Sequence, residues 1–384
     1  MKTMLDRLHR DERGMSMVFV GCGFMAFLAA TTLAIDVGMF MTARSQSQNS
    51  ADAGALAGAL ALYFDDYDNR SASGPAVQNA LSGARANTVI HQMVDVTPAD
   101  VTFPVSPAGL NNRIKVQVFR TSGRGNPLQT LMGRIFKVNT VNVGAEATAE
   151  ASPADAMTCV KPFTIPDKWV EKQTPPWDPD DTFDMYDRHG NPLPIEQQDV
   201  YVPVGEPGYS GYNAWRDKGT ELMIRAGTGH DIMPSFYFSY AMGGVSGGSE
   251  YEWNIANCNT TLMGFGDLLL MEPGNMVGPT SDGIDDLIAK DPGAYWDRTL
   301  NKPMSTKSPS PRVVRIPVYD PVYYDTGKLN GRYTDLKVAN YLGFFITGRS
   351  GNTVYGRITP VTGVITGNGP APAGAFPMAI RLVE

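Results

Sequence analysis

One segment of the sequence has a spacing of residues that could support nucleophilic chemistry. Gly244-Val-Ser-Gly-Gly248 fits the pattern G-x-S-x-G. In hydrolases this pattern holds a serine at a sharp turn between a strand and a helix, and a histidine acts as its base. The residues after Gly248 show no helical periodicity, and none of the four histidines is a convincing base. We therefore interpret Ser246 as a loop residue and predict no catalytic residue.

Carboxylates gather in one short segment, where their oxygens could hold a calcium ion. The residues are Asp178, Asp180, Asp181, Asp184 and Asp187. Their spacing differs from that of an EF-hand loop, and the residues among them are also typical of turns, so a calcium site and a set of turns both stay open. The sequence has no phosphate-binding loop, no His-Glu-x-x-His and no dinucleotide-binding glycine motif after a strand. We therefore assign no metal ligands and predict no cofactor and no small-molecule substrate.

An uncharged apolar segment from Met15 to Ile35 could cross a membrane. As a helix these residues span about 30 Å, the thickness of a hydrocarbon core. Four basic residues precede the segment and one follows within twenty residues, which predicts a cytoplasmic N-terminus and an exported remainder. A cleaved secretory signal is the competing interpretation. It fits less well, because signal cores have about 7 to 15 apolar residues and this segment continues directly into a helical sequence.

Export would place two of the three cysteines in an oxidising compartment. Cys22 lies inside the apolar segment and is interpreted as a small apolar residue. Cys159 and Cys258 lie outside it, and a disulfide between them would close a loop of about 100 residues. Such a loop closure stabilises a fold by roughly 4.7 kcal/mol if the effect is chain entropy. Two unpaired buried thiols are the alternative.

The composition limits the classes of protein. The 384 residues include 39 acidic and 32 basic ones, and a net charge of −7 argues against nucleic-acid binding. Because 42% of the residues are hydrophobic, a wholly disordered chain is excluded. The 40 glycines and 28 prolines predict many turns, as in all-β or α+β proteins.

The residues after the apolar segment predict a continuation of its helix to about Leu62. Gly54 and Gly58 in this helix have the spacing that allows close helix packing. A second helix is expected from Pro75 to about Met93, and a short third one after Asn126-Pro127. Strict alternation predicts strands at 113–118 and 141–152, the latter with small inward residues that require a close neighbour such as the Ala-rich helix.

Beyond Ser152 the sequence predicts a β-rich body. Short β runs are expected at 222–225, 236–240, 268–271, 313–319, 342–347, 354–358 and 379–383. One helix is expected from Thr280 to Lys290, and residues 302–311 are expected to form a loop. We predict an α+β chain with a cytoplasmic leader (1–14), a transmembrane helix (15–35), a helical spine with a small α+β unit (36–155) and a β-rich extracytoplasmic domain (156–384).

The N-terminal stretch resembles TadG-like Flp pilus-assembly proteins, the TadE/TadG-like proteins of the tight-adherence system. The resemblance covers about residues 12–62. It is carried by Arg13-Gly14, the apolar span, Ile35-Asp36-Val-Gly38 and Arg44-Ser-Gln-Ser-Gln-Asn-Ser-Ala-Asp-Ala-Gly-Ala-Leu-Ala-Gly-Ala59.

The resemblance implies a single-pass protein of the bacterial inner membrane, with a pilin-like helical spine and its bulk in the periplasm. Other pilus-assembly or envelope proteins are its implied partners. Short relatives are cut by a prepilin peptidase after a glycine, and Gly14 stands at that position. Phe19 stands where pilin-like relatives carry Glu, so both a cut leader and an uncut anchor stay open.

The leading hypothesis is therefore a non-enzymatic structural or assembly component of a Flp pilus (type IVc) or its secretion machinery. The alternative is a membrane-tethered module that binds glycans or the cell wall. Tyr209, Tyr212 and Trp215 are the expected platform for that alternative, and a buried aromatic cluster is the favoured interpretation of the same three residues. A hydrolase that uses Ser246 is the third hypothesis.

Overall fold

The computed structural model describes residues 15–383 except 108, 188, 228–230, 275, 330–334 and 368–369. The proposed leader and its Gly14 lie outside the described residues. The chain divides into two compact units. Unit 1 consists of Met1–Ala59, Asn69–Ala149 and Leu382–Glu384, and unit 2 consists of Leu60–Asp68 and Glu150–Arg381.

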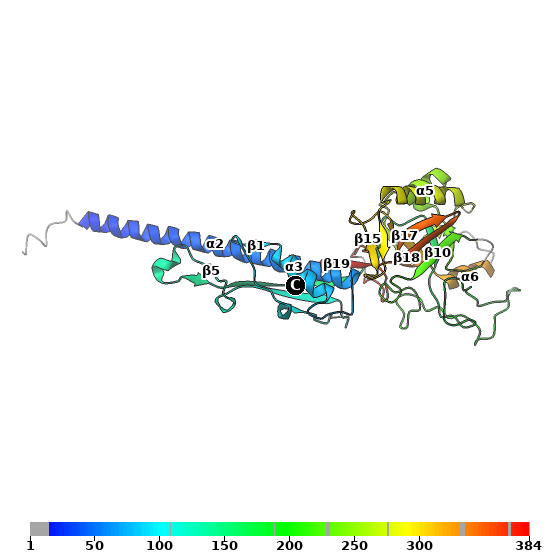
Figure 1. The fold of residues 1–384 in the computed structure, drawn as a ribbon, viewed down its shortest axis with the longest axis horizontal. Helices are drawn as coiled ribbons and strands as arrows, with labels where there is room; N and C mark the ends of the chain where they lie inside the picture. Colours follow the sequence, from blue (N-terminus) through cyan, green and yellow to red (C-terminus); the bar gives the residue numbers. More distant parts are fainter. Residues whose placement is uncertain are drawn as a thin grey trace, which may run out of the picture. The chain divides into compact units, whose positions relative to one another are not determined.

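The predicted span and spine form one continuous helix, α2 (Met15–Phe64), of 50 residues (Figure 1, blue). No proline interrupts it, and Ala, Leu, Met and Gln dominate its second half. It ends beside the polar segment Asp65–Gly74, which forms turns. The chain is thus α+β, with a long N-terminal apolar helix followed by a β-rich body, as the sequence predicted.

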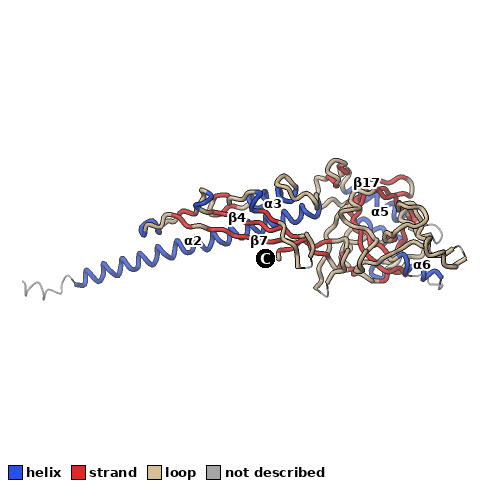
Figure 2. The backbone as a smooth tube through the Cα atoms, turned by 90° about the horizontal axis from the view of Figure 1, so that it is seen from below, coloured by secondary structure: helices blue, strands red, loops and turns tan. Residues whose placement is uncertain are grey.

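Unit 1 packs short strands along the second half of α2 (Figure 2). Its longest strands, β4 and β7, are neighbours in one sheet, and β3 pairs with β4 in an antiparallel manner. The burial of β4 alternates strictly, as its sequence predicted. The elements that lie or begin in unit 1 after α2 are α3 (Pro75–Arg85), β1 (Thr88–Val89), β2 (Gln92–Met93), η2 (Pro98–Asp100), β3 (Val101–Thr102), β4 (Arg113–Arg120), η3 (Ser122–Arg124), β5 (Leu128–Gln129), η4 (Gly133–Phe136), β6 (Thr140–Val141) and β7 (Val143–Pro153).

Two helix predictions in unit 1 were wrong. The helix from Pro75 ends at Arg85, and residues 88–93 form the β1–β2 hairpin instead. Ile90 and His91 make its turn with φ of 45° and 63°, which breaks the helical path. The short helix after Asn126 is absent, because residues 128–129 pair with β6 as strand β5.

Unit 2 is built around a closed sheet. Strands β17-β16-β9-β11-β10-β18 follow one another, and β18 pairs again with β17. Phe344 of β17 faces both Val314 of β16 and Ile358 of β18, which closes the ring. Closure leaves no open edge within the ring. The strands that lie or begin in unit 2, inside and outside this ring, are β8 (Ala156–Met157), β9 (Phe163–Pro166), β10 (Glu221–Ala226), β11 (Phe236–Ser239), β12 (Met263–Gly264), β13 (Leu268–Leu270), β14 (Tyr295–Asp297), β15 (Lys302–Met304), β16 (Val313–Tyr319), β17 (Asp335–Ser350), β18 (Thr353–Ile358) and β19 (Met378–Leu382).

Three α-helices, α4 (Gly248–Ala256), α5 (Val277–Lys290) and α6 (Pro321–Leu329), and the turn η5 (Met242–Gly244) complete unit 2. Only α5 was predicted, and it starts at Val277 rather than Thr280, because Met276 takes the position before the first turn. Residues 302–304, predicted as loop, form β15. The core of unit 2 is rich in aromatic residues, including Phe163, Tyr341 and Phe344.

Candidate functional site

The apolar part of α2 presents its side chains outward. Nearly every residue from Met15 to Ile35 is exposed, including Phe19, which is 72% exposed. α2 is long and apolar enough to cross a membrane, and no other part of the structure covers its most apolar stretch of 18 residues. Exposure of such a surface to water is unfavourable, since removing apolar surface from water stabilises a protein by about 25 cal/mol per Å².

Asp36, directly after this segment, binds a distant loop of unit 1. Its carboxylate accepts hydrogen bonds from three consecutive backbone amides, those of Leu131 (3.0 Å), Met132 (3.1 Å) and Gly133 (2.6 Å). Only 4% of Asp36 is exposed. Consecutive amides that converge on one anion form a favourable site for negative charge. Asp36 therefore fixes the residues that follow β5 to the point on α2 where the apolar segment ends.

Further along α2, small residues allow α3 and β4 to approach closely. A Cβ atom on Gly54 would lie 2.9 Å from both the carbonyl oxygen of Ala80 and the Cβ of Ala84. A Cβ atom on Gly58 would lie 2.5 Å from Ile114 Cδ1. The glycine spacing that the sequence suggested for close packing thus serves contacts within unit 1.

The last turn of α2 belongs to unit 2 and is buried there. Tyr63 is 1% exposed, and its hydroxyl lies 2.7 Å from the carbonyl oxygen of Phe376. The Nζ atom of Lys218 donates to the carbonyls of Phe64 (2.6 Å) and Asp65 (2.8 Å). These bonds satisfy carbonyl groups that a helix end leaves without partners.

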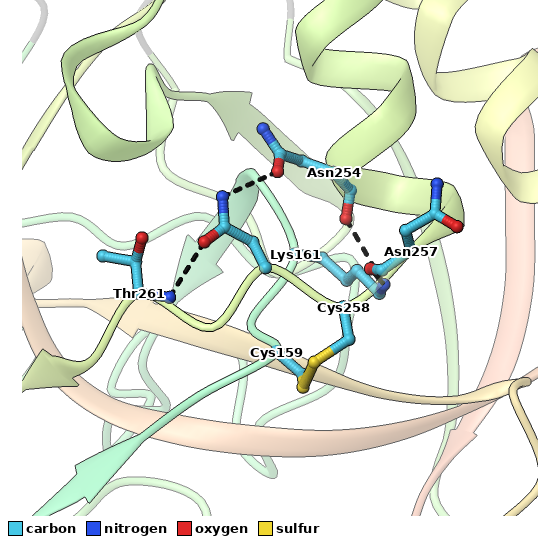
Figure 3. The surroundings of a disulfide bond; sticks show 7 residues. Cys159, Lys161, Asn254, Asn257, Cys258 and Thr261 are labelled. Atoms are coloured by element: carbon cyan, nitrogen blue, oxygen red, sulfur yellow. Dashed lines mark hydrogen bonds between the residues drawn. A yellow bond between two sulfur atoms is a disulfide. The ribbon is translucent and has the colours of Figure 1, made fainter.

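Cys159 and Cys258 form a disulfide at the C-terminal end of α4 (Figure 3), and their sequence separation is 99. Cys258 directly follows Asn257, the C-cap residue of α4. The Nζ atom of Lys161 donates to the carbonyls of Asn257 (2.7 Å) and Asn254 (3.4 Å), as Figure 3 shows. A cation at this position also matches the negative end of the helix dipole.

The environment of Lys161 disfavours its charged form. Burial lowers the pKa of Lys161 to about 7, and the nearby charges of Lys290 and Arg315 lower it further. Lys290 reaches the same helix end, where its Nζ atom lies 2.5 Å from the carbonyl oxygen of Ala256. The disulfide and both lysines therefore hold the C-terminus of α4 in place.

Three of the five aspartates at 178–187, namely Asp178, Asp181 and Asp187, accept hydrogen bonds in turns. Asp181 accepts from the backbone amide of Asp178 at 2.6 Å, and Asp178 accepts from that of Asp180 at 2.7 Å. Asp187 accepts from the amides of His189 (2.8 Å) and Asn191 (2.9 Å). Within the described ranges, no three His, Cys, Asp or Glu side chains gather as metal ligands would.

A buried carboxylate, Asp167, organises the aromatic residues that were considered as a glycan platform. It is 0% exposed and accepts from the hydroxyls of Tyr209 (2.8 Å) and Tyr201 (3.1 Å) and from the amide of Tyr212 (3.1 Å). Burial raises the pKa of Asp167 to about 6, although these hydrogen bonds act to lower it. Sequence reasoning missed Asp167, because its partners lie more than thirty residues away.

The predicted platform is not a surface. Tyr212 is 0% exposed, and Tyr209 points its hydroxyl at Asp167. Trp215 is half-buried and stacks on Tyr67, with ring centroids 4.2 Å apart. These rings bury their apolar area inside unit 2 and cannot stack on a sugar together.

A cavity of about 510 Å³ lies beside this cluster, and its lining includes Trp169, Trp177, Arg216 and Asp217. The Nζ atom of Lys168 lies 4.7 Å from the ring centroid of Trp177. The indole nitrogen of Trp177 is buried, and none of the described residues accepts a hydrogen bond from it. The cavity thus combines an aromatic wall with charged groups of both signs.

Ser246 is exposed and lies between η5 and α4. A helix does follow this serine, so the expectation of no helix there was wrong. The preceding strand β11 ends at Ser239, and η5 intervenes before the serine. The hydrolase arrangement requires a strand, a turn with the serine and a helix to follow one another directly. They do not do so here.

Comparison with known protein families gives one match. Residues 14–61 match the family described as "Putative Flp pilus-assembly TadE/G-like". The match includes the exposed apolar helix, Asp36 and both close-packed glycines of α2. It bears out the resemblance to TadG-like proteins that the sequence suggested. Comparisons with curated proteins and with solved structures give no significant match.

Proposed function

We propose, from the match of residues 14–61 to the Flp pilus-assembly family, that this chain is a membrane-anchored structural component of a Flp pilus or of its secretion machinery. The match is the observation that carries the proposal. Proteins of this kind act by assembling with others, and we therefore assign the chain a non-enzymatic role.

The exposure of α2 supports a membrane anchor. Its residues Met15–Ile35 present apolar side chains that water would disfavour and lipid would accept. The bias of basic residues toward the N-terminal side favours a cytoplasmic N-terminus and a periplasmic body. In that topology the Cys159–Cys258 disulfide would lie in an oxidising compartment.

Exposed apolar residues continue on α2 past the anchor and support docking to partner helices. Val37 and Met41 are 40% and 70% exposed, and they continue at intervals of four residues from Leu33, which lies at the end of the anchor and is 64% exposed. Residues at this interval share one helix face. Such a face fits a neighbouring apolar helix of a pilus or envelope protein.

A co-purification experiment tests the proposal. The full chain carries a C-terminal tag in cells that make Flp pili, and the control chain has only the exposed span, residues 15–35, replaced by an unrelated apolar span, which leaves the packed half of α2 unchanged. We expect pilus or secretion-system proteins to be enriched with the native chain and lost with the control. Equal recovery of these proteins from both chains would contradict a specific role of the native span in assembly.

Processing at Gly14 is a separate point within this proposal. We assign the chain as an uncut anchor, because Phe19 stands where the cut pilin-like relatives carry Glu. Mass spectrometry of the chain purified from its native membrane should then find residues 1–14 attached. A mature N-terminus at Met15 would instead identify the chain as a processed, pilin-like subunit.

The cavity beside Trp177 favours one second candidate, a cell-wall glycan module. An aromatic ring with nearby charged and polar groups is the usual composition of a small-ligand site. Binding of the full chain to a glycan array, lost on Trp177→Ala, would support this candidate. No binding by the native chain would remove it.

A further inference from the structure

The tip between β5 and β6 presents a cluster of apolar side chains to solvent. Leu131, Ile135, Phe136 and Val138 are 60%, 70%, 62% and 49% exposed. A cluster of exposed apolar residues within eight positions is unusual for a surface that meets only water. This segment, Leu131–Val138, is called the tip below.

The tip owes this exposure to a defined backbone structure. The amide of Val138 donates to the carbonyl of Gly133 at 3.0 Å, and the Thr130 hydroxyl lies 2.6 Å from the Val138 carbonyl oxygen. A Cβ atom on Gly133 would meet the same carbonyl oxygen at 2.9 Å, so this position needs glycine. Hydrogen bonds within and next to the tip thus fold its backbone, and the apolar side chains are left outside.

Asp36 fixes the position of the tip along α2. Its carboxylate holds the amides of Leu131 to Gly133, and Asp36 is the first residue after the apolar segment Met15–Ile35. The tip therefore lies beside the end of the apolar segment. If that segment spans a bilayer, the tip is at the level of the headgroups.

The charges of the tip fit the same environment. Arg134 and Lys137 are both exposed, and the tip contains no acidic residue. Long basic side chains place their apolar stems beside lipid tails and their charged ends among headgroups. Each such residue near an anionic lipid surface is worth about 1 kcal/mol of attraction.

We propose that the tip inserts into the lipid headgroup boundary of the membrane that holds α2, with Ile135 and Phe136 toward the acyl chains and Arg134 and Lys137 at anionic headgroups. This inference rests on the proposed membrane anchorage. The tip is a second point of attachment beside the helix, and it fixes the rotation of α2 about its own axis. Unit 1 then presents the same face to its partner proteins in every copy of the chain.

Lipid-quenching of a fluorophore tests the proposal on the full chain in vesicles of phosphatidylcholine and phosphatidylglycerol. An environment-sensitive thiol label is placed on native Cys22, or on Ile135→Cys or Met93→Cys in a Cys22→Ala background, without reductant so that the disulfide stays intact. Spin-labelled lipids then quench any label that lies in the bilayer. The Cys22 label reports the anchor by itself.

Met93 is the matched control for the tip. It is 62% exposed and apolar, and it belongs to the β1–β2 hairpin of unit 1. The amide of Ile90 in that hairpin donates to Gln46 at 2.8 Å, ten residues after Asp36. At 1.5 Å per residue, this hairpin lies about 15 Å beyond the tip along α2, past the headgroups.

We expect strong quenching and a blue-shifted emission at Cys22 and Ile135, and neither effect at Met93. Replacing Arg134 and Lys137 by glutamine should weaken quenching at Ile135 when phosphatidylglycerol is present and leave it unchanged in phosphatidylcholine alone. If the Cys22 label is quenched and the Ile135 label is not, the inference is overturned, whereas the membrane anchor is supported. The tip would then be a contact for a protein partner. Equal quenching at Ile135 and Met93 would overturn it as non-specific adhesion. An unquenched Cys22 label would overturn both the anchor and the inference.

Discussion

Replacing Gly54 by alanine should destabilise unit 1, although alanine is the better helix former. The added Cβ would lie 2.9 Å from the backbone oxygen of Ala80, 2.9 Å from the Cβ of Ala84 and 3.2 Å from Val116 Cγ1. Two of these neighbours are a backbone atom and a Cβ, which move only if α3 itself moves. Alanine gains about 1 kcal/mol of helix propensity, whereas overpacking costs about 1–3 kcal/mol. We expect a net loss of up to about 2 kcal/mol in the free energy of unfolding.

Gly38→Ala in the same helix is the matched control. No atom lies within 4 Å of a Cβ built on Gly38, so this variant should keep or gain up to about 1 kcal/mol. Urea unfolding of the full chain in detergent, with hydrogen exchange of the β4 amides as the reporter of unit 1, measures both variants. The reasoning is refuted if Gly54→Ala is as stable as Gly38→Ala.

Three further predictions concern other contacts. Replacing Cys159 and Cys258 by alanine should lower the free energy of unfolding of unit 2 by roughly 4–5 kcal/mol in urea titrations without reductant. A change below about 1 kcal/mol would exclude loop closure as the main effect of the disulfide on stability. Burial lowers the pKa of Lys161 from 10.5 to about 7, so its contribution to stability is complete above pH 10.5 and is lost progressively as the pH falls from 10.5 to 7. Lys161→Met should remove a slope of up to about 1.4 kcal/mol per pH unit between these values, and an unchanged slope would count against a buried Lys161. Asp36→Asn leaves a side chain with one acceptor oxygen for three backbone amides, so hydrogen exchange of the amides of residues 131–133 should become faster. Unchanged protection of these amides would show that the loop does not depend on Asp36.

Long periodic segments of the fold could be read from the sequence. The absence of proline predicted α2, and strict alternation predicted β4. The predicted strand at 342–347 is the middle of the 16-residue strand β17. Its ends were missed because β17 is buried over most of its length, and a strand buried on both faces loses its alternation. The helix from Pro75 was overextended because the turn at Ile90 and His91 depends on backbone angles that the sequence pattern does not reveal.

The candidate site was only partly readable. The apolar segment and the family pattern lie in one continuous stretch, and a sequence shows such a stretch directly. The contact between Asp36 and Gly133 joins residues 97 positions apart, so no local pattern predicts it. Tyr212 could be interpreted either as a core residue or as a binding residue, because aromatic residues serve both cores and surfaces. Only the packing around Asp167 distinguishes the two.

Piliation of a deletion strain is the most direct test of the proposed role. Surface Flp pili are counted by electron microscopy in the native strain, in a strain that lacks this chain, and in the deletion strain complemented by the native chain or by the chain with residues 15–35 replaced by an unrelated apolar span. We expect pili to be lost on deletion and restored by the native chain alone. Normal piliation of the deletion strain would contradict the account.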